Sequence, residues 1–366
     1  MTALELHGSR ILIGAGLLDQ CGAELRAALP GRRLAIVSDE TVAPLYASRV
    51  AAACAPASVP IHTIPAGEEN KTRKSWSRLT DELLDAGFGR DSAIIALGGG
   101  VVGDLAGFVA ATYMRGIPFV QMPTSLLAMI DAAIGGKTGV DTRAGKNLVG
   151  AFHHPALVIV DPLALATLPA GHVRNGLAEA IKHAVIASRA EFEWLEANVQ
   201  SLLRAGGPDV ALAERLAAVH IGIKAGIVAR DEREGGIRKV LNFGHTIGHA
   251  VETLSGYAML HGECVAVGMV AETRVAEIIG VADDGLTESI SALCRSAGLP
   301  TTFPDSMSAA AILAATRRDK KARAGAVEYA LPSALGHMAG AGHGYGTPVP
   351  DAAVLEALFR SNGAPH

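Results

Sequence analysis

The sequence predicts a Rossmann-like α/β N-terminal domain followed by a mostly α-helical C-terminal domain. Over about the first 160 residues, short runs of Val, Ile, Leu and Ala alternate with helical stretches, and Ala- and Leu-rich helical stretches then dominate. Continuous apolar runs without polar alternation are typical of parallel strands that are buried on both faces. A chain of 366 residues has room for two domains. We therefore expect domains at residues 1–161 and 162–366.

Five apolar runs are the expected strands of the first domain. They cover residues 34–38, 59–64, 93–97, 119–122 and 157–160. The segment 74–86 between two of them has the helical period. In a parallel sheet with helices on its faces, ligands bind beyond the carboxyl ends of the strands. Residues that directly follow these strands are therefore candidates for a binding site.

The second half of the chain is expected to be helical. Helical patterning covers residues 173–199, 210–230, 245–254, 262–280 and 286–297. Strand-like patterning returns only at residues 326–331. The Gly- and His-rich segment 336–345 is predicted to be a mobile loop rather than a metal site.

The composition excludes several classes of protein. Hydrophobic residues make up 49% of the chain and charged residues 19%, which excludes a disordered chain. The 32 Lys and Arg against 36 Asp and Glu give a net charge of −4, so no overall positive field exists to hold nucleic acid or an acidic membrane surface. The most apolar stretch, residues 92–114, contains Asp104 and a glycine triplet, which suits a buried strand and a turn better than a membrane helix. The expected partner is a small molecule.

The cysteines and the N-terminus indicate a cytoplasmic protein. The four cysteines are scattered at Cys21, Cys54, Cys264 and Cys294, without the paired spacing of a disulfide framework or a Cys-rich zinc site. The first residues lack a basic segment followed by an apolar one, so no signal peptide is expected.

A glycine-rich turn follows the expected strand at 93–97. The segment GGGVVGD at residues 98–104 stands between a strand and a helix, where backbone amides and the helix dipole can hold a pyrophosphate. It departs from the G-x-G-x-x-G fingerprint, so a plain turn remains the alternative. Asp39, at the end of another strand, is either an acceptor for ribose hydroxyls or a helix N-cap.

Three histidines and a glutamate indicate a metal site. His245 and His249 have the i, i+4 spacing that puts two imidazoles on one face of a helix, and His261 follows. Two histidines and a carboxylate such as Glu179, around an open position, are the usual composition of a catalytic zinc site. The i+4 partner could serve a substrate instead, and buried structural histidines are the alternative for the whole cluster.

Cationic residues accumulate beside glycine turns and apolar helices. Each alone is typical of a solvated surface, but as a set they could bind a substrate with several negative charges. They are Arg115, Lys137, Lys146, Lys182, Lys224, Arg238, Lys320 and Lys321.

Over nearly its whole length the sequence resembles the 3-dehydroquinate synthases, which are members of the sugar phosphate cyclases. The resemblance is carried by ten motifs: PAGEENK at 65–71, GGGVVGD at 98–104, YMRG at 113–116, PTSLLA at 123–128, DAAIGGK at 131–137, GKN at 145–147, GLAEAIK at 176–182, RKVLNFGHTIGH at 238–249, HGE at 261–263 and DKK at 319–321.

The resemblance implies a dehydroquinate synthase-like fold, with an NAD-binding first domain and a metal- and substrate-binding second domain. It implies conversion of 3-deoxy-D-arabino-heptulosonate 7-phosphate to 3-dehydroquinate and phosphate, a step of the shikimate pathway. The cofactors would be NAD and Zn²⁺ or Co²⁺. The steps would be a transient oxidation, phosphate elimination, re-reduction and an intramolecular aldol closure, so that NAD is regained. A cytoplasmic homodimer is also implied.

The family roles carry over to particular positions of this chain. The implied metal ligands are Glu179, His245 and His261. The implied NAD contacts are Asp39, Glu68, Lys71, Gly100, Val101, Val102, Gly103, Asp104, Thr124, Ser125, Lys137, Lys146 and Thr167. Lys224 and Arg238 would hold the substrate carboxylate, and Asp131 and Lys182 the ring hydroxyls. The groups around the phosphate would be Lys137, Asn147, Asn242, His249, one of Lys320 and Lys321 (Lys320 being our choice), and Arg115 from across a subunit interface.

Three other functions compete with this interpretation. Another sugar phosphate cyclase of secondary metabolism could act on sedoheptulose 7-phosphate, glucose 6-phosphate or an amino analogue. The pair Lys224 and Arg238 argues against uncarboxylated substrates, but it does not exclude the amino analogue, which keeps the carboxylate. A metal-dependent polyol dehydrogenase would need fewer cations, and an inactive homologue would be free to lose metal ligands that are all present here.

Overall fold

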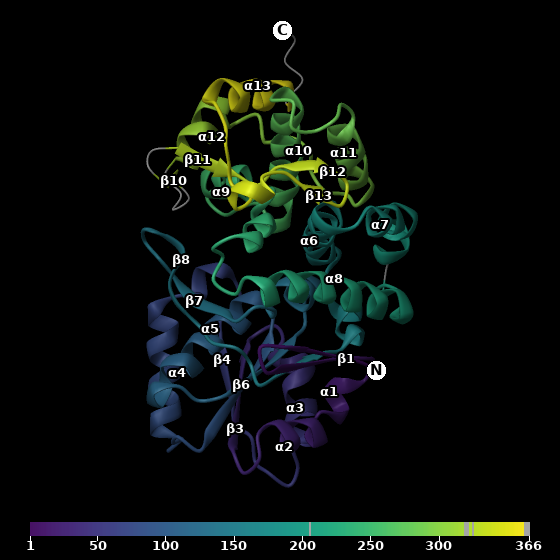
Figure 1. The fold of residues 1–366 in the computed structure, drawn as a ribbon. Helices are drawn as coiled ribbons and strands as arrows, with labels where there is room; N and C mark the ends of the chain where they lie inside the picture. Colours follow the sequence, from purple (N-terminus) through teal and green to yellow (C-terminus); the bar gives the residue numbers. More distant parts are fainter. Residues whose placement is uncertain (205, 318–321, 324–325, 362–366) are drawn as a thin grey trace. The chain divides into compact units, whose positions relative to one another are not determined.

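A computed structural model of the chain describes residues 1–204, 206–317, 322–323 and 326–361 (Figure 1). The described chain divides into two compact units. The first comprises Met1–Leu168 and Gly206–Ala225, and the second comprises Pro169–Ala205 and Gly226–His366. Neither unit is therefore one continuous stretch of chain, and a domain boundary between residues 161 and 162 stays a prediction.

The first unit is built on a seven-stranded sheet with the order β1-β2-β9-β6-β5-β3-β4. All neighbouring pairs are parallel except β1 and β2, which form an antiparallel hairpin at the edge of the sheet. The strands are β1 (Thr2–Leu6), β2 (Ser9–Ile13), β3 (Arg33–Asp39), β4 (Ile61–Ile64), β5 (Ser92–Gly98), β6 (Phe119–Pro123) and β9 (Leu157–Val160). The predicted parallel sheet is confirmed, and the β1–β2 hairpin is an addition to the prediction.

Helices cover both faces of this sheet. In Figure 1, α1 (Leu17–Gln20), α2 (Gly22–Ala28) and α3 (Ala43–Ala53) lie on one side of the strands, and α4 (Arg73–Asp85) and α5 (Gly100–Thr112) lie on the other. The central strands are buried because apolar side chains on both faces meet these helices, as Ile94 of β5 does in the core that it shares with Leu105 of α5. A separate hairpin of β7 (Lys137–Thr142) and β8 (Gly145–Phe152) packs against α5.

The second unit is a helical bundle around α10. Its helices are α6 (Ala170–Ala187), α7 (Arg189–Leu202), α9 (His245–Leu254), α10 (His261–Ile278), α11 (Leu286–Ser296), α12 (Ala309–Thr316) and α13 (Asp351–Ser361). α10 contacts α6, α9, α11 and α13 and is buried along most of its length. The helix α8 (Val210–Arg230) begins in the first unit, and its last residues belong to the second.

Two predicted elements of the second unit are wrong. The expected single helix at 173–199 is two helices, because Ser188 is extended and its hydroxyl accepts a hydrogen bond from the Glu191 amide at the start of α7. The segment 336–345, expected to be a loop, contains β13 (His337–Met338) and one turn of 3-10 helix at Ala341–His343. The strand β13 forms because it pairs with β12 (Pro332–Ala334).

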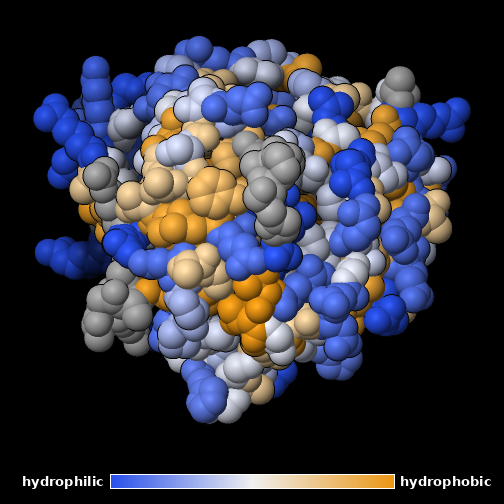
Figure 2. Space-filling view, turned by 90° about the horizontal axis from the view of Figure 1, so that it is seen from above, coloured by the Kyte–Doolittle hydropathy of each residue, from blue (hydrophilic) through white to orange (hydrophobic). Residues whose placement is uncertain are grey.

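Hydrophilic residues dominate the face of the molecule seen in Figure 2, with hydrophobic side chains gathered near its centre. The second unit exposes some large hydrophobic residues, of which Phe359 of α13 is 56% exposed. Three short strands, β10 (Ala322–Arg323), β11 (Ala326–Tyr329) and β14 (Thr347–Pro348), form a small sheet. Within the described ranges, no helix combines the length and the apolar character that a membrane crossing needs.

Candidate active site

The first unit has a topological switch point between β3 and β5. From β3 the chain moves to β4 on one side and then returns to β5 on the other side. Such a point opens a crevice beyond the carboxyl ends of the strands. Asp39 ends β3, the glycine-rich turn follows β5, and Thr124 and Ser125 follow β6. The Thr124 amide donates a hydrogen bond to the Gly98 carbonyl at 2.9 Å, so these predicted NAD contacts gather at one edge of the sheet.

The glycine-rich turn places the start of α5 at this edge. Gly99 is the N-cap of the helix, and the predicted NAD contacts Gly100, Val101, Val102, Gly103 and Asp104 form its first turns. A Cβ atom on Gly103 would lie 2.6 Å from Gln121 Oε1, so glycine lets α5 pack closely against the buried Gln121 side chain of β6. Free amides and the positive end of the helix dipole make this edge suitable for a pyrophosphate.

Asp39 caps the turn that leads into α3. One of its carboxylate oxygens, Oδ1, accepts hydrogen bonds from the Thr41 and Val42 amides at 2.9 and 2.8 Å. The local N-cap role is thus present, and it orients the carboxylate at the carboxyl end of β3. Thr167 lies at the end of a 3-10 helix, and its hydroxyl hydrogen-bonds the Tyr46 hydroxyl of α3 at 2.6 Å.

A buried lysine organises the remaining cofactor candidates of the first unit. Lys71 Nζ lies 2.5 Å from Asp104 Oδ2 and 2.6 Å from Asn147 Oδ1. Burial acts to lower the pKa of Lys71, but Asp104 and Glu68 outweigh it and raise that pKa, so the ammonium stays charged. Lys146 Nζ lies 3.5 Å from Glu68 Oε1. The structure thus brings Asn147, predicted near the phosphate, together with the predicted NAD contacts.

Asp131 and Lys224 form a second polar cluster of the first unit. Asp131 lies in one turn of π-helix at Ala128–Ala132, a local form that is frequent at functional sites. Lys224 Nζ donates to the Asp131 carbonyl oxygen at 2.6 Å and lies 2.9 Å from its carboxylate Oδ1. Lys224, which was predicted to bind the substrate carboxylate, is therefore paired with Asp131, which was predicted to bind a ring hydroxyl. Lys137, at the start of β7, is exposed.

Arg115 is exposed in a strained turn after α5. Met114 and Arg115 have φ angles of 50° and 69°, in the left-handed region that non-glycine residues rarely adopt. Gly116 continues the turn with a φ of 115°. Such strain persists where the surrounding structure fixes it, often at functional positions.

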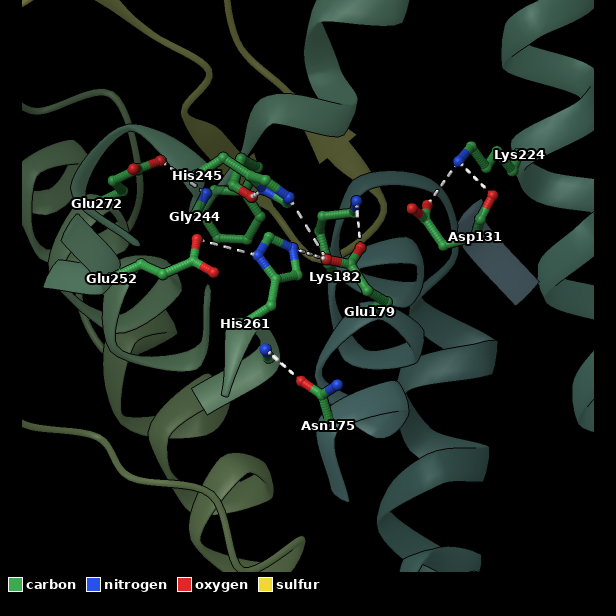
Figure 3. Close-up of polar contacts among 12 residues, drawn as sticks. Asp131, Asn175, Glu179, Lys182, Lys224, Gly244, His245, Glu252, His261 and Glu272 are labelled. Carbon is green, nitrogen blue, oxygen red and sulfur yellow. Dashed lines mark hydrogen bonds and ion pairs between the residues drawn. The ribbon is translucent and has the colours of Figure 1, made fainter. Parts of the chain in front are cut away.

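In the second unit, three helices bring together the predicted metal ligands (Figure 3). Glu179 comes from the middle of α6, while His245 and His261 are the first residues of α9 and α10. Glu179 Oε1 lies 3.4 Å from His245 Nε2 and 3.5 Å from His261 Nε2. Candidate ligand atoms of all three residues lie within 4.8 Å of one another.

These distances fit a zinc ion. Ligand atoms about 2.0–2.1 Å from a tetrahedral zinc lie about 3.3 Å from one another, close to the two nitrogen–oxygen distances observed here. One carboxylate and two imidazoles leave a fourth position open, as in catalytic zinc sites. Glu179, His245 and His261 would therefore hold the metal.

The charges of Glu179 and His245 suit metal ligands, whereas His261 must first lose a proton. Burial acts to raise the pKa of Glu179, but Lys182 and the two imidazoles hold that pKa well below its usual value, so the carboxylate is ionised. Burial, together with Lys182, lowers the pKa of His245 to about 3 and keeps its imidazole neutral. Burial opposes a charge on His261, but hydrogen bonds to Glu179 and Glu252 raise its pKa to about 10. A metal bound through His261 would displace that proton.

Other groups of the second unit orient the three candidate ligands. His245 Nδ1 hydrogen-bonds the Phe243 carbonyl oxygen at 3.0 Å, and His261 Nδ1 lies 3.4 Å from Glu252 Oε2. These contacts direct the Nε2 atoms of both rings towards Glu179, as outer acceptors do around metal-binding histidines. Lys182, one turn after Glu179 on α6, forms an ion pair with its other oxygen.

Arg238 is held in a compact loop before α9. Its guanidinium donates to the Glu232 carbonyl oxygen, and the residue is only 2% exposed. Asp231 closes the loop, because its carboxylate accepts hydrogen bonds from the backbone amides of Gly235, Gly236 and Arg238 at 2.9, 2.7 and 3.0 Å. Asn242, predicted near the phosphate, donates instead to the Glu234 carboxylate on the same loop.

The stability that Asp231 contributes should depend on pH. Burial acts to raise the pKa of Asp231, but three backbone hydrogen bonds and Arg238 lower it overall. The stabilisation is then complete above the ordinary carboxyl pKa of about 3.9 and is lost as the pH falls through the lower pKa of the folded state. We expect Asp231→Asn to lower the urea midpoint by the same amount at about pH 7 and pH 5, and by less at about pH 3. A pH-independent difference would contradict this cause.

Sequence reasoning missed residues that support the site. Glu252 follows His245 and His249 at the i+7 position of the same helix face, so this spacing was a usable signal. His249 itself lies beside both candidate ligands, with ring centroids 5.2 Å from His245 and 5.9 Å from His261. Glu272 of α10 approaches the start of α9, and Asn175 of α6 approaches the start of α10, so no local pattern predicts their contacts.

The predicted Lys320 and its alternative Lys321 lie outside the described residues.

Comparison with known protein families finds matches to both the N-terminal and the C-terminal part of the chain. The sequence model for the 3-dehydroquinate synthase N-terminal part matches residues 61–175, and that for the C-terminal part matches residues 176–322. The chain belongs to the 3-dehydroquinate synthase family. The family that the motifs predicted is thus confirmed.

Relatives named 3-dehydroquinate synthase match nearly the full chain. The protein of Symbiobacterium thermophilum is 48% identical over 341 residues, which cover 92% of this chain and 94% of the relative. That of Desulforamulus reducens is 45% identical over 331 residues, 90% of this chain and 91% of the relative. Each of the two alignments therefore covers more than nine-tenths of the relative.

Solved structures share its fold. The 2-epi-5-epi-valiolone synthase of Streptomyces hygroscopicus, solved with NAD⁺ and Zn²⁺ bound, is 30% identical with a TM-score of 0.87 and 99% coverage of both chains. A 2-deoxy-scyllo-inosose synthase is 24% identical with a TM-score of 0.89, and the match covers 98% of this chain and 100% of that one. The predicted fold class of the family member is confirmed.

Proposed function

We propose that this chain is a 3-dehydroquinate synthase, which converts 3-deoxy-D-arabino-heptulosonate 7-phosphate to 3-dehydroquinate and phosphate. The observation that carries the proposal is the site of Glu179, His245 and His261 in a chain 48% identical to a relative named for this activity. NAD and Zn²⁺ or Co²⁺ are the proposed cofactors, supported by the switch point of the first unit and by this ligand set.

Each unit offers a different part of the chemistry. When bound, the divalent metal would polarise substrate oxygens, and NAD would accept a hydride and return it. In the first unit, the start of α5 and the charged Lys71 would hold the anionic cofactor. In the second unit, Lys182 sits beside Glu179 and would donate hydrogen bonds to ring hydroxyls of the substrate.

Cationic and hydrogen-bonding side chains would bind the anionic groups of the substrate. Lys224 and Arg238 remain the proposed partners of the carboxylate. The phosphate partners that we propose are Lys137, Asn147, Asn242, His249, Arg115 and Lys320. Holding a flexible seven-carbon chain in one conformation is the main help that such groups give to ring closure.

A homodimer in the cytoplasm is also part of the proposal. The exposed Arg115 in its strained turn supports a role at a subunit interface, since a side chain there is available to a second copy. Sedimentation of the purified protein is expected to give the mass of two chains, and a monomer that is fully active would refute this part.

A second sugar phosphate cyclase activity is the alternative, because a 2-epi-5-epi-valiolone synthase shares the fold at 30% identity. The relatives named 3-dehydroquinate synthase are more similar in sequence, at 45–48%. The pair Lys224 and Arg238 also suits a substrate that carries a carboxylate.

Phosphate release tests the proposal directly. The purified protein is given NAD, zinc and the heptulosonate phosphate, with sedoheptulose 7-phosphate in a parallel reaction, and NADH absorbance is followed. We expect phosphate from the heptulosonate alone and no net NADH. Phosphate from sedoheptulose 7-phosphate would establish the alternative cyclase, and NADH without phosphate would make the protein a dehydrogenase.

A further inference from the structure

The helix that carries His245 at its first position is capped from another helix. Gly244, the N-cap of α9, has a φ of 77° and no side chain, so the first amides of α9 lack a local acceptor. Glu272 of α10 supplies it. Its Oε2 accepts from the Gly244 amide at 2.7 Å, and its Oε1 accepts from the Ile247 amide at 2.9 Å. This carboxylate does from a distance what an N-cap aspartate does locally.

Glu272 is a buried carboxylate that needs the amides of α9 as partners. The residue is fully buried, and a buried carboxylate is costly unless hydrogen bonds and charges compensate it. Two backbone amides and the positive end of the α9 dipole provide such compensation. Glu272 thereby fixes the start of α9, and with it the position of His245, against α10 (Figure 3).

The start of α10 is held in the same manner by α6. Asn175 Oδ1 accepts a hydrogen bond from the Gly262 amide, the second residue of α10, at 2.5 Å. A Cβ on Gly262 would lie 2.2 Å from the Asn175 carbonyl oxygen, so only glycine allows this approach. Asn175 precedes Glu179 by four residues and therefore lies on the same face of α6.

We propose that Asn175 and Glu272 are positioning residues of the metal site, because they cap the two helices that begin with the histidine ligands. The positions of the three ligands are then linked through the helices. The helix α6 carries Glu179 and caps α10, and α10 carries His261 and caps α9, which carries His245. The inference rests on the metal binding proposed above. Both residues act through the placement of the histidines, without contact to the metal.

Asn175 allows a matched pair of variants. Asn175→Ala removes the acceptor for the Gly262 amide, whereas Asn175→Asp keeps an acceptor oxygen and adds a charge that suits a helix N-terminus. Zinc affinity of the purified protein is measured by competition with a chromophoric chelator. We expect Asn175→Ala to bind zinc about 10-fold to 100-fold more weakly, as outer supports of metal ligands do, and Asn175→Asp to bind like the wild type.

Glu272→Gln tests the second cap. Its amide group has the same size but can accept from only one of the two backbone amides, so we expect about 10-fold weaker zinc binding or more. Ser308→Ala serves as the matched control, since the Ser308 hydroxyl caps α12 of the same unit at the Ala311 amide. The control should lower the melting temperature of the zinc-free protein and leave zinc affinity unchanged.

The outcomes separate this inference from the proposed function. Zinc binding by the wild type together with unchanged affinity in Asn175→Ala and Glu272→Gln would overturn the positioning role. An equal loss in Asn175→Ala and Asn175→Asp would overturn the role of the hydrogen bond. If the wild type binds neither zinc nor cobalt, the metal site is overturned instead, and with it the proposed function.

Discussion

An His245→Ala variant is expected to lose bound zinc and catalytic activity together. The site offers three ligands, and two remaining ligands hold a divalent ion poorly while the third position is open to water. A metal that polarises the reacting oxygen contributes several kcal/mol to lowering the barrier, and each 1.36 kcal/mol is a factor of ten in rate. We therefore expect a rate at least about 10³-fold lower, and a zinc content near zero after dialysis.

The same experiment has a matched histidine control. His337 is exposed in the second unit and lies in the Gly- and His-rich segment, so His337→Ala removes an imidazole without touching the proposed ligands. Its zinc content and rate should equal those of the wild type. Full zinc content in His245→Ala would remove His245 from the ligand set, and zinc loss in His337→Ala would place a metal in that segment instead.

A Gly268→Ala variant is expected to separate α9 from α10. The added Cβ would lie 1.9 Å from the Gly244 carbonyl oxygen and 2.7 Å from the Gly248 amide nitrogen. Both atoms belong to the backbone of α9 and its cap, so no side-chain rotation relieves the overlap. Overpacking of a core costs 1–3 kcal/mol, and more where the backbone must move, so we expect a loss of about 3 kcal/mol in the free energy of unfolding.

The measurement is thermal unfolding of the zinc-free protein, followed by zinc affinity. Gly268→Ala should lower both, since the start of α9 carries His245. The control is Gly222→Ala on α8, where the structure has no atom within 4 Å of the added Cβ. That change should be neutral or stabilise the helix by about 0.5–1 kcal/mol. A melting temperature of Gly268→Ala equal to that of the wild type would contradict the close helix contact.

Most of the central sheet could be predicted from the sequence, because β3, β5, β6 and β9 are largely apolar on both faces. Such continuous apolar runs can be recognised without knowing which strands pair with one another. The β1–β2 hairpin was missed because neither strand is a continuous apolar run: β1 is mostly exposed, and β2 begins with Ser9 and Arg10. The break at Ser188 was also missed. It does have a local signal, since Ser188 and Glu191 have the spacing of a capping box.

The metal site shows a different limit of sequence reasoning. Residue types and the spacing of the three histidines indicated a metal, with Glu179 as a candidate carboxylate. The resemblance to the family then implied Glu179, His245 and His261 as its ligands. The groups that hold these ligands come from elsewhere in the fold: Glu272 is 28 residues from Gly244, and Asn175 is 87 residues from Gly262. Such contacts depend on how helices pack, which a single sequence does not specify.

The first unit is made of two separate segments of the chain, and this affects the order in which its parts are synthesised. Residues Gly206–Ala225 belong to this unit, and the Glu214 carboxylate of α8 accepts a hydrogen bond from the Ala15 amide near the N-terminus. Translation delivers α6 and α7 of the second unit before it delivers α8. On the ribosome, the N-terminal unit therefore stays incomplete until residue 225 has emerged, after α6 and α7 of the second unit have already been synthesised.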